Sequence, residues 1–154
     1  MNAREVSEAV VAWARAELAD LRAGYPYPIF DSGALPDLVV VTQAIRTVPS
    51  DPENFPFELL EQVWLKVFDV ELSIGVEQAD GAKGAQEAHQ ALEGYAETLM
   101  GSAIDDATLG SRVPMVSPRV EADLAEPFKE RKDGTRVREL YMKFVVAEPL
   151  EVEP

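Results

Sequence analysis

The first 23 residues show the spacing of an amphipathic helix. Apolar side chains recur every three to five positions between residues 3 and 23, while Arg4, Glu8 and Arg15 fall mostly on other faces. This period predicts a helix that buries one face and ends near Gly24. The expected buried positions are Val6, Val10, Trp13, Leu18 and Leu21.

Residues 24 to 36 are rich in proline and glycine. Proline lacks a backbone donor and glycine has an unrestricted backbone, so both interrupt helices. This segment is therefore predicted to be a loop, held over the core by four side chains: Tyr25, Tyr27, Ile29 and Phe30.

The next segment, residues 38 to 45, reads LVVVTQAI and carries β-branched side chains on both faces. That pattern is typical of a strand that is buried on both sides or central in a sheet. Three prolines follow within eight residues. Because proline cannot donate to a strand ladder, residues 48 to 62 are predicted to form a long loop.

A clear alternation then gives way to a helical period. Residues 63 to 77 place Phe68, Val70, Leu72 and Ile74 on one face and polar residues on the other, which predicts a long strand with one wet face. Residues 80 to 104 predict a second helix with Asp80 as its N-cap. Its expected buried stripe is Ala85, Ala88, Leu92, Tyr95 and Leu99.

The C-terminal part predicts a hairpin. Residues 112 to 128 alternate imperfectly and contain Pro114 and Pro118, as expected of an edge or bent strand. The pair Asp133-Gly134 is a strong hairpin signal, although the charges around it could lengthen the loop. The last strand begins at residue 137, with Leu140, Met142, Phe144 and Val146 on one face.

The resulting order is α-β-β-α-β-β. We therefore expect an α+β fold in which two helices lie on one face of an antiparallel, roughly four-stranded sheet. Residues 1–148 form a single domain in this interpretation, and residues 149–154 form an acidic C-terminal tail.

Composition narrows the class of protein. A chain of 154 residues with 47% hydrophobic content can close a core of its own, and it has no cysteine for disulfides, zinc thiolates or a thiol nucleophile. The charged start MNAREVSEAV does not resemble a signal region, and no apolar run reaches the roughly 18 residues of a membrane span. We expect a soluble protein that is made inside the cell and has no membrane partner.

The charge is unevenly distributed. The chain carries 14 basic and 28 acidic side chains, yet residues 129 to 143 hold six of the basic and only three of the acidic ones. An acidic surface repels DNA phosphates, which argues against a general nucleic-acid binder. We interpret this segment as a protruding hairpin that meets an acidic partner surface, through Lys129, Arg131, Lys132, Arg136 and Arg138.

Candidate catalytic and ligand-binding residues are few. His89 has only Glu93 at helical spacing, Asp105-Asp106 fits a solvated helix end, and GAKGAQ lacks the Lys-Ser/Thr of a phosphate loop. No motif pairs a nucleophile with a base. The sequence therefore predicts no enzyme, no metal site and no cofactor.

The order of elements resembles the tail terminator proteins, or tail completion proteins, of long-tailed bacteriophages (siphoviruses). The resemblance covers nearly the whole chain. It is carried by the opening helix, PDLVVV, VWLKVFDVELSIGV, HQALEGYAETLMGSAI and the closing strand pair around KDGTR. These are architectural features without a catalytic signature.

The resemblance implies a structural virion protein. Such a protein forms a homo-hexameric ring on the last ring of the tail tube, stops tube polymerisation and provides the surface for head-tail joining. The implied partners are other copies of the chain, the tail tube protein and a neck or stopper protein. DNA would pass through the lumen without specific binding, and the ring would assemble in the host bacterial cytoplasm and remain in the virion at the head-proximal end of the tail.

Three other interpretations stay open at this point. The chain could be another head-tail connector or neck component of similar size. It could be a small nucleic-acid-binding regulator that uses the basic hairpin. The hairpin could also be a solvated edge whose charges only deter aggregation.

Overall fold

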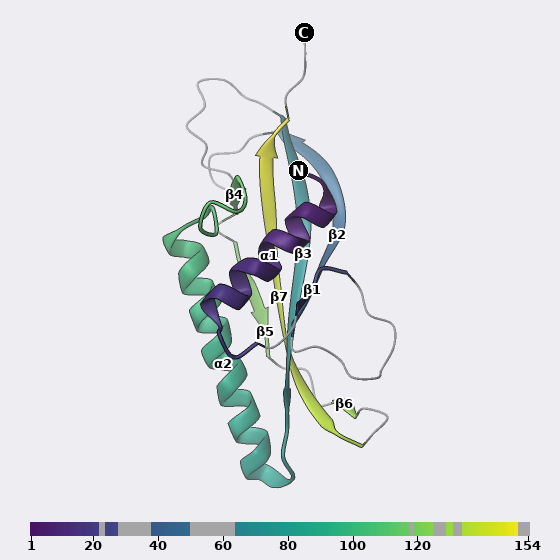
Figure 1. The fold of residues 1–154 in the computed structure, drawn as a ribbon, viewed down its shortest axis with the longest axis vertical. Helices are drawn as coiled ribbons and strands as arrows, with labels where there is room; N and C mark the ends of the chain where they lie inside the picture. The colour runs from purple at the N-terminus through teal and green to yellow at the C-terminus, as the bar shows by residue number, and fades with distance from the viewer. Residues whose placement is uncertain are drawn as a thin grey trace.

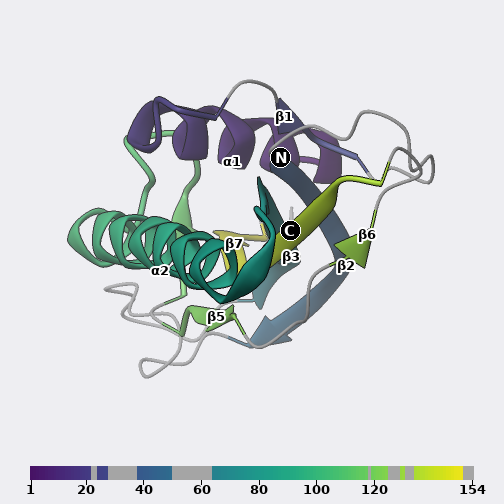
Figure 2. The ribbon, with the colours of Figure 1, turned by 90° about the horizontal axis from the view of Figure 1, so that it is seen from below.

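The computed structural model describes residues 1–21, 24–27, 38–49, 64–117, 119–124, 129–130 and 134–150. In this part of the chain, two helices pack on a curled sheet (Figures 1 and 2). The helices are α1 (Ala3–Glu17) and α2 (Gly81–Asp105). The strands are β1 (Gly24–Tyr25), β2 (Leu38–Pro49), β3 (Trp64–Glu77), β4 (Met115–Val116), β5 (Glu121–Asp123), β6 (Lys129–Glu130) and β7 (Arg136–Pro149).

The centre of the sheet is antiparallel. The 14 residues of β3 pair with β2 on one side and with the 14 residues of β7 on the other. β1 pairs with the start of β2 in the parallel direction, through Gly24 with Leu38 and Tyr25 with Val39. The sheet is therefore mixed, with a long antiparallel core and one short parallel strand.

Three short strands together line the outer edge of β7. Val116 pairs with Val146, Glu121 with Lys143 and Lys129 with Val137, so β4, β5 and β6 follow one another along β7. The chain between β4 and β5, and again between β5 and β6, contains two more residues than the stretch of β7 opposite it. These two segments are called the gaps below. The sequence places Pro118 in the first gap and Pro127 in the second, where a residue without an N–H cannot continue the ladder.

The α+β class with two helices is confirmed, whereas the predicted sheet is only partly matched. The order includes β1, which the sequence interpretation assigned to a loop. The expected edge strand of residues 112–128 is divided into β4 and β5, and β6 follows it as a separate short strand. Among the described residues the sheet has seven strands rather than four, and it is not wholly antiparallel. The difference arises at the edges, because prolines limit the length of pairing along β7 and Gly24 lets β1 lie close to α1. A hydrophobic pattern indicates neither effect.

Both helices lie on the same concave face of the sheet. α1 crosses β2 diagonally. α2 contacts α1 and packs against β3 and β7 (Figures 1 and 2). One buried cluster joins the helices to the inward side chains of all three long strands. The inward residues of β3 and β7 are those that the alternation predicted: Phe68, Val70, Leu72, Ile74, Leu140, Met142, Phe144 and Val146.

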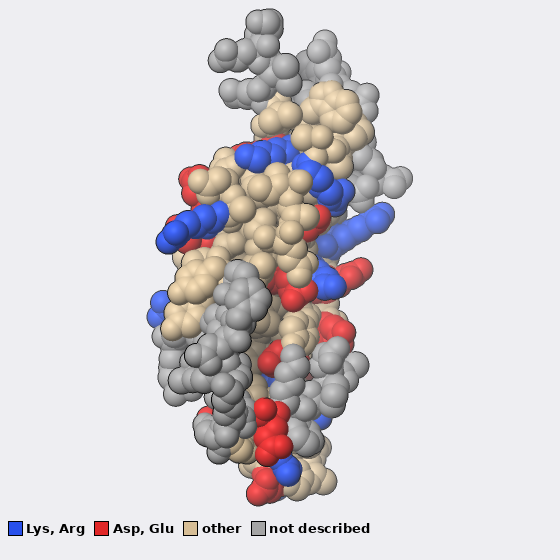
Figure 3. All heavy atoms as spheres, turned by 90° about the vertical axis from the view of Figure 1, so that its right-hand side faces the viewer, with Lys and Arg blue, Asp and Glu red and all other residues tan. Residues whose placement is uncertain are grey.

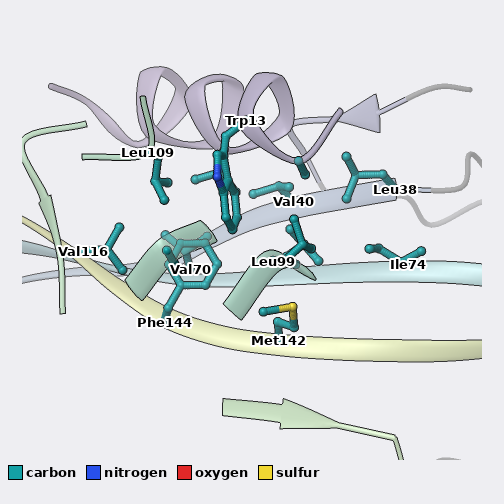
Figure 4. Close-up of a cluster of buried hydrophobic side chains, with 14 of the residues drawn as sticks. Trp13, Leu38, Val40, Val70, Ile74, Leu99, Leu109, Val116, Met142 and Phe144 are labelled. Carbon is teal, nitrogen blue, oxygen red and sulfur yellow. The ribbon is translucent and has the colours of Figure 1, made fainter. Parts of the chain in front are cut away.

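Trp13 lies where the two helices meet the sheet (Figure 4). Its indole Nε1 donates a hydrogen bond to Ser102 Oγ on α2 at 3.0 Å. Its ring meets Phe144 of β7 edge to face, with centroids 6.2 Å apart. A buried indole needs a partner for its N–H, and Ser102 supplies one without interrupting the apolar contacts.

The opposite face of the sheet is partly exposed to solvent in its middle and carries a buried apolar cluster at one end. Asp69, Glu71 and Ser73 alternate with the inward residues and are partly exposed, as predicted. Leu65 and Val67 share their side of the strand but are fully buried. They belong to a second cluster with Met115 and Ala147, so the wet face does not extend over the whole strand.

α1 begins as the sequence suggests but ends earlier than predicted. Asn2 accepts a hydrogen bond from the Glu5 backbone N–H, and the Glu5 carboxylate accepts one from Asn2, which completes a capping box. The helix ends at Glu17 instead of near Gly24. Leu18 and Leu21 are nevertheless buried, because the chain beyond the helix continues across the core.

α2 packs through small residues. Its buried positions are Gly84, Ala88, Leu92, Ala96, Leu99 and Ala103. Ala88, Leu92 and Leu99 were predicted, whereas Ala85 and Tyr95 are only half-buried. Asp80 is the N-cap residue as expected, but its side chain makes no capping hydrogen bond.

The predicted loop from residue 24 differs from the structure at its start. A Cβ on Gly24 would lie 2.6 Å from Val11 Cγ1, so only glycine lets β1 approach α1 this closely. Tyr25 and Tyr27 stack on one another at 5.4 Å and remain exposed, so they do not cover the core. Ile29, Phe30 and most of the predicted loop 48–62 lie outside the described residues.

Two glycines of α2 should respond to alanine in opposite directions. A Cβ on Gly84 would lie 2.1 Å from the Ala79 carbonyl oxygen, whereas Gly94 has nothing within 4 Å. We expect Gly84→Ala to lower the free energy of unfolding by about 1–3 kcal/mol through this clash. We expect Gly94→Ala to raise it by up to about 1 kcal/mol, because alanine is the better helix former. Urea unfolding of both variants tests this, and equal shifts would contradict the close packing at Gly84.

Candidate interaction surface

The predicted basic segment is partly built into the sheet. Lys129 pairs with Val137 and forms the start of β6, while Arg136 and Arg138 belong to the first residues of β7. Arg131 and Lys132 lie outside the described residues. The connection between β6 and β7 spans residues 131–135, so it is longer than a two-residue Asp-Gly turn.

Contacts at the base of the hairpin tie it to the junction between β3 and α2. Arg138 Nε donates to Gln78 Oε1 at 3.1 Å, and Arg136 lies 3.6 Å from an Asp80 carboxylate oxygen. The Gln78 N–H also donates to the Arg136 carbonyl at 2.9 Å. Arg136 and Arg138 therefore have structural partners within the chain, and the interaction role of the five basic residues stays a prediction.

The free edge of β2 is a second exposed surface, which the sequence interpretation missed. Leu38 and Val40 are buried, but residues 43–47 are all exposed, including Ile45 at 51%. The predicted strand was expected to be buried on both sides or central in the sheet; it is buried on one face at Leu38 and Val40, Val39 is half-buried, and neither expectation holds for residues 43–45. Among the described strands, β2 pairs on this edge only with β1, at Leu38 and Val39. Three polar side chains within residues 43–47, those of Gln43, Arg46 and Thr47, were the signal that could have indicated this edge.

Figure 3 looks onto this side of the molecule. Lys and Arg side chains gather across the upper half of the face, interspersed with acidic ones. On β2, Arg46 reaches across to β3, where its Nε lies 3.1 Å and its Nη2 3.2 Å from Asp69 carboxylate oxygens. This paired contact holds the guanidinium beside the sheet, with half of the side chain still exposed.

The opposite edge of the sheet is acidic at β5. Glu121, Ala122 and Asp123 are all exposed. Glu121 and Asp123 line a cavity of about 620 Å³ together with Glu71, Tyr141 and Lys143. In that cavity Lys143 Nζ lies 3.9 Å from a Glu71 carboxylate oxygen, and the Tyr141 hydroxyl donates to the Glu139 carboxylate.

The residues weighed as catalytic candidates have ordinary contacts. His89 Nε2 lies 3.7 Å from Glu93 on the exposed side of α2. Asp106 follows the last residue of α2 and accepts hydrogen bonds from Thr108 Oγ1 at 2.6 Å, Thr108 N at 2.9 Å and Gly110 N at 3.0 Å. Within the described ranges, no three His, Cys, Asp or Glu side chains converge as a metal site would require.

Neither the models of known protein families nor the curated proteins contain a match to this chain. Within the described residues, neither helix combines the length and apolarity needed to cross a lipid bilayer. The surfaces above are therefore interpreted from their geometry and charge, together with the resemblance given by the order of elements.

The turn after α2 should carry a measurable pKa signature. Hydrogen bonds from the Thr108 hydroxyl first, and then from the backbone N–H groups of Thr108 and Gly110, lower the pKa of Asp106. A carboxyl whose folded pKa is lowered stabilises the fold above its unfolded pKa, and that contribution is lost as pH falls through the folded pKa. We expect Thr108→Val to raise the pKa of Asp106 towards its ordinary value, as followed by carboxyl NMR titration. Thr47→Val, on exposed β2, is the control and should leave the titration unchanged.

Proposed function

We propose that this protein is a structural ring component of a long-tailed bacteriophage. A homo-hexameric ring of the chain caps the head-proximal end of the tail tube, stops tube polymerisation and presents the surface that joins the tail to the head. Its partners are neighbouring copies, the tail tube protein and a neck or stopper protein. Its place is the virion, after assembly in the host cytoplasm.

The observation that carries this proposal is the order of elements along the chain, together with their packing within the described residues. The resemblance implies a small α+β protomer that opens with an amphipathic helix and closes with a strand pair. The described residues fit that outline, because α1 and α2 share the concave face of a sheet built around β3 and β7. The fold class supports the proposal but does not by itself specify a function.

Charge gives a second line of support. A ring that DNA passes through needs a wall that does not hold phosphates, and a chain with net charge −14 can supply an acidic or neutral lumen. Six of the 14 basic residues are concentrated in residues 129–143, so this segment can serve contacts with acidic partner surfaces instead. Complementary charge sets partner choice and docking rate at such contacts.

The number of copies per tail tests the ring. A cap on a rotationally symmetric tube must match its symmetry, so we expect six copies at the head-proximal end of each tail. Quantitative mass spectrometry of purified tails, normalised to the tube protein, gives the count, and electron microscopy of tails labelled at the C-terminus gives the position. One or two copies per tail, or label at the distal end, would exclude this function.

The basic hairpin can be tested separately from the fold. We expect Arg131→Glu with Lys132→Glu to leave the free energy of unfolding within about 0.5 kcal/mol, as surface changes usually do. The same double variant should reduce the yield of joined particles, because it places like charges against an acidic partner. The matched control is Arg4→Glu with Lys83→Glu, which changes the net charge equally at two exposed helix positions. Equal joining by both variants would mean that the hairpin is only a solvated edge.

A further inference from the structure

Within the described residues, the antiparallel core of the sheet ends in two edges on opposite sides, along which no further strand is paired. The first is β2 beyond Val39, and the second is β5, which pairs only with β7 among the described strands. Both stretches are exposed to solvent. An exposed edge presents unpaired N–H and C=O groups, so it is a ready template for a strand from another chain.

The directions of these two edges suit head-to-tail contacts. β2 is antiparallel to β3, β3 to β7 and β7 to β5, so β5 runs opposite to β2. If a second copy is placed beside the first in the same orientation, its β5 edge meets the β2 edge of the first copy as an antiparallel neighbour. A contact of this kind is heterologous and can repeat around a ring.

On both edges, the length available for pairing with another chain is limited by irregular backbone or proline at its ends. On β2, the register shift between Thr42 and Ala44 marks one end of the regular ladder, and Pro49 marks the other. On the β5 side, the described stretch Arg119–Leu124 lies between Pro118 and Pro127 in the sequence. Bulges and prolines block uncontrolled edge pairing, so each edge offers a window of only about five or six residues.

The charges within the two windows are complementary. Arg46 pairs with Val67, whose side of β3 also carries Asp69 and Glu71, so Arg46 projects from the convex face of the sheet. Glu121 pairs with Lys143, which itself pairs with Glu71, so Glu121 projects from the same face. Opposite charges directly across two antiparallel strands stabilise the pair.

We propose that the β2 edge of one copy pairs in antiparallel fashion with the β5 edge of the next, with Arg46 opposite Glu121. This register also places Ala44 opposite Asp123. The contact builds one sheet that continues from copy to copy, and Arg46 bridges the boundary on the convex face. The proposal rests on the ring of the proposed function and names the surfaces that close it.

A cysteine pair tests the register directly, because the natural chain contains no cysteine. Ala44→Cys with Asp123→Cys places thiols on the same face of neighbouring strands in adjacent copies. Within one copy β3 and β7 lie between the two positions, and the register also offsets them along β7, from Val145 to Tyr141. Strands are about 4.8 Å apart, so this separation exceeds the roughly 7 Å that a disulfide can span. Mild oxidation should therefore give only intermolecular links, seen as a ladder up to six chains on a non-reducing denaturing gel.

The matched control is Ala44→Cys with Ala122→Cys. Ala122 pairs with Met142, an inward residue, so its side chain lies on the concave face, away from position 44 of the neighbour. The oxidation is done on concentrated purified protein and on assembled tails. A ladder for the Asp123 pair in either sample, without one for the Ala122 pair, supports the register. No ladder in either sample, or equal ladders for both pairs, would overturn it.

Charge exchange provides an independent readout. Arg46→Glu and Glu121→Arg, each alone, should weaken association about fivefold by placing like charges opposite one another, and the double variant should restore it to within about twofold. Sedimentation of the purified protein, or the occupancy of tails, measures association, and thermal melts of dilute protein check the fold. A double variant that associates no better than the singles would argue against this contact.

The outcomes separate this contact from the ring itself. Six copies per tail without the specific cysteine ladder would leave the ring function standing and remove the edge pairing. The ladder together with one or two copies per tail would keep the pairing as a self-assembly contact and remove the tail-capping function.

Discussion

The packing of Trp13 is the contact on which the arrangement of the layers depends. Its ring packs against Phe144 of β7, and its N–H is satisfied by Ser102 of α2, so this one side chain of α1 contacts both the second helix and the sheet. Ser7 adds a further link, because its hydroxyl lies 2.7 Å from the Thr42 hydroxyl on β2. With one face of the sheet covered in this way, the opposite face and the edges are the parts of the sheet that remain for contacts with other molecules.

Much of this core could be predicted because burial imposes a period on the sequence. The alternation from Phe68 to Ile74 and from Leu140 to Val146 identified the inward faces of β3 and β7, and the spacing from Val6 to Trp13 identified the buried face of α1. The end of α1 was harder to predict from the sequence. Leu18 and Leu21 continue the apolar pattern after the helix has stopped, since burial does not require helical backbone.

The edges were predicted poorly for a physical reason. An edge strand is held by backbone pairing to one neighbour, so its side chains need not alternate, and residues 43–47 carry no burial signal at all. β1 can form because Gly24 has no Cβ and can lie close to α1. A hydrophobic pattern gives no information about such a close approach. The predicted basic segment identified a place of unusual charge, but it could not show that Arg136 and Arg138 bind back to Asp80 and Gln78.

The interrupted edge along β7 also constrains which insertions and deletions the chain can accept. Each gap adds two residues relative to β7, an even number, so the alternation of side chains is the same before and after it. An insertion that moved β5 by one position along β7 would carry Glu121 to the apolar side of the sheet, where a carboxylate is costly. A shift of two positions would return Glu121 to its present side, so a designed change of two residues at these gaps keeps the pattern of the surface whether or not β5 moves.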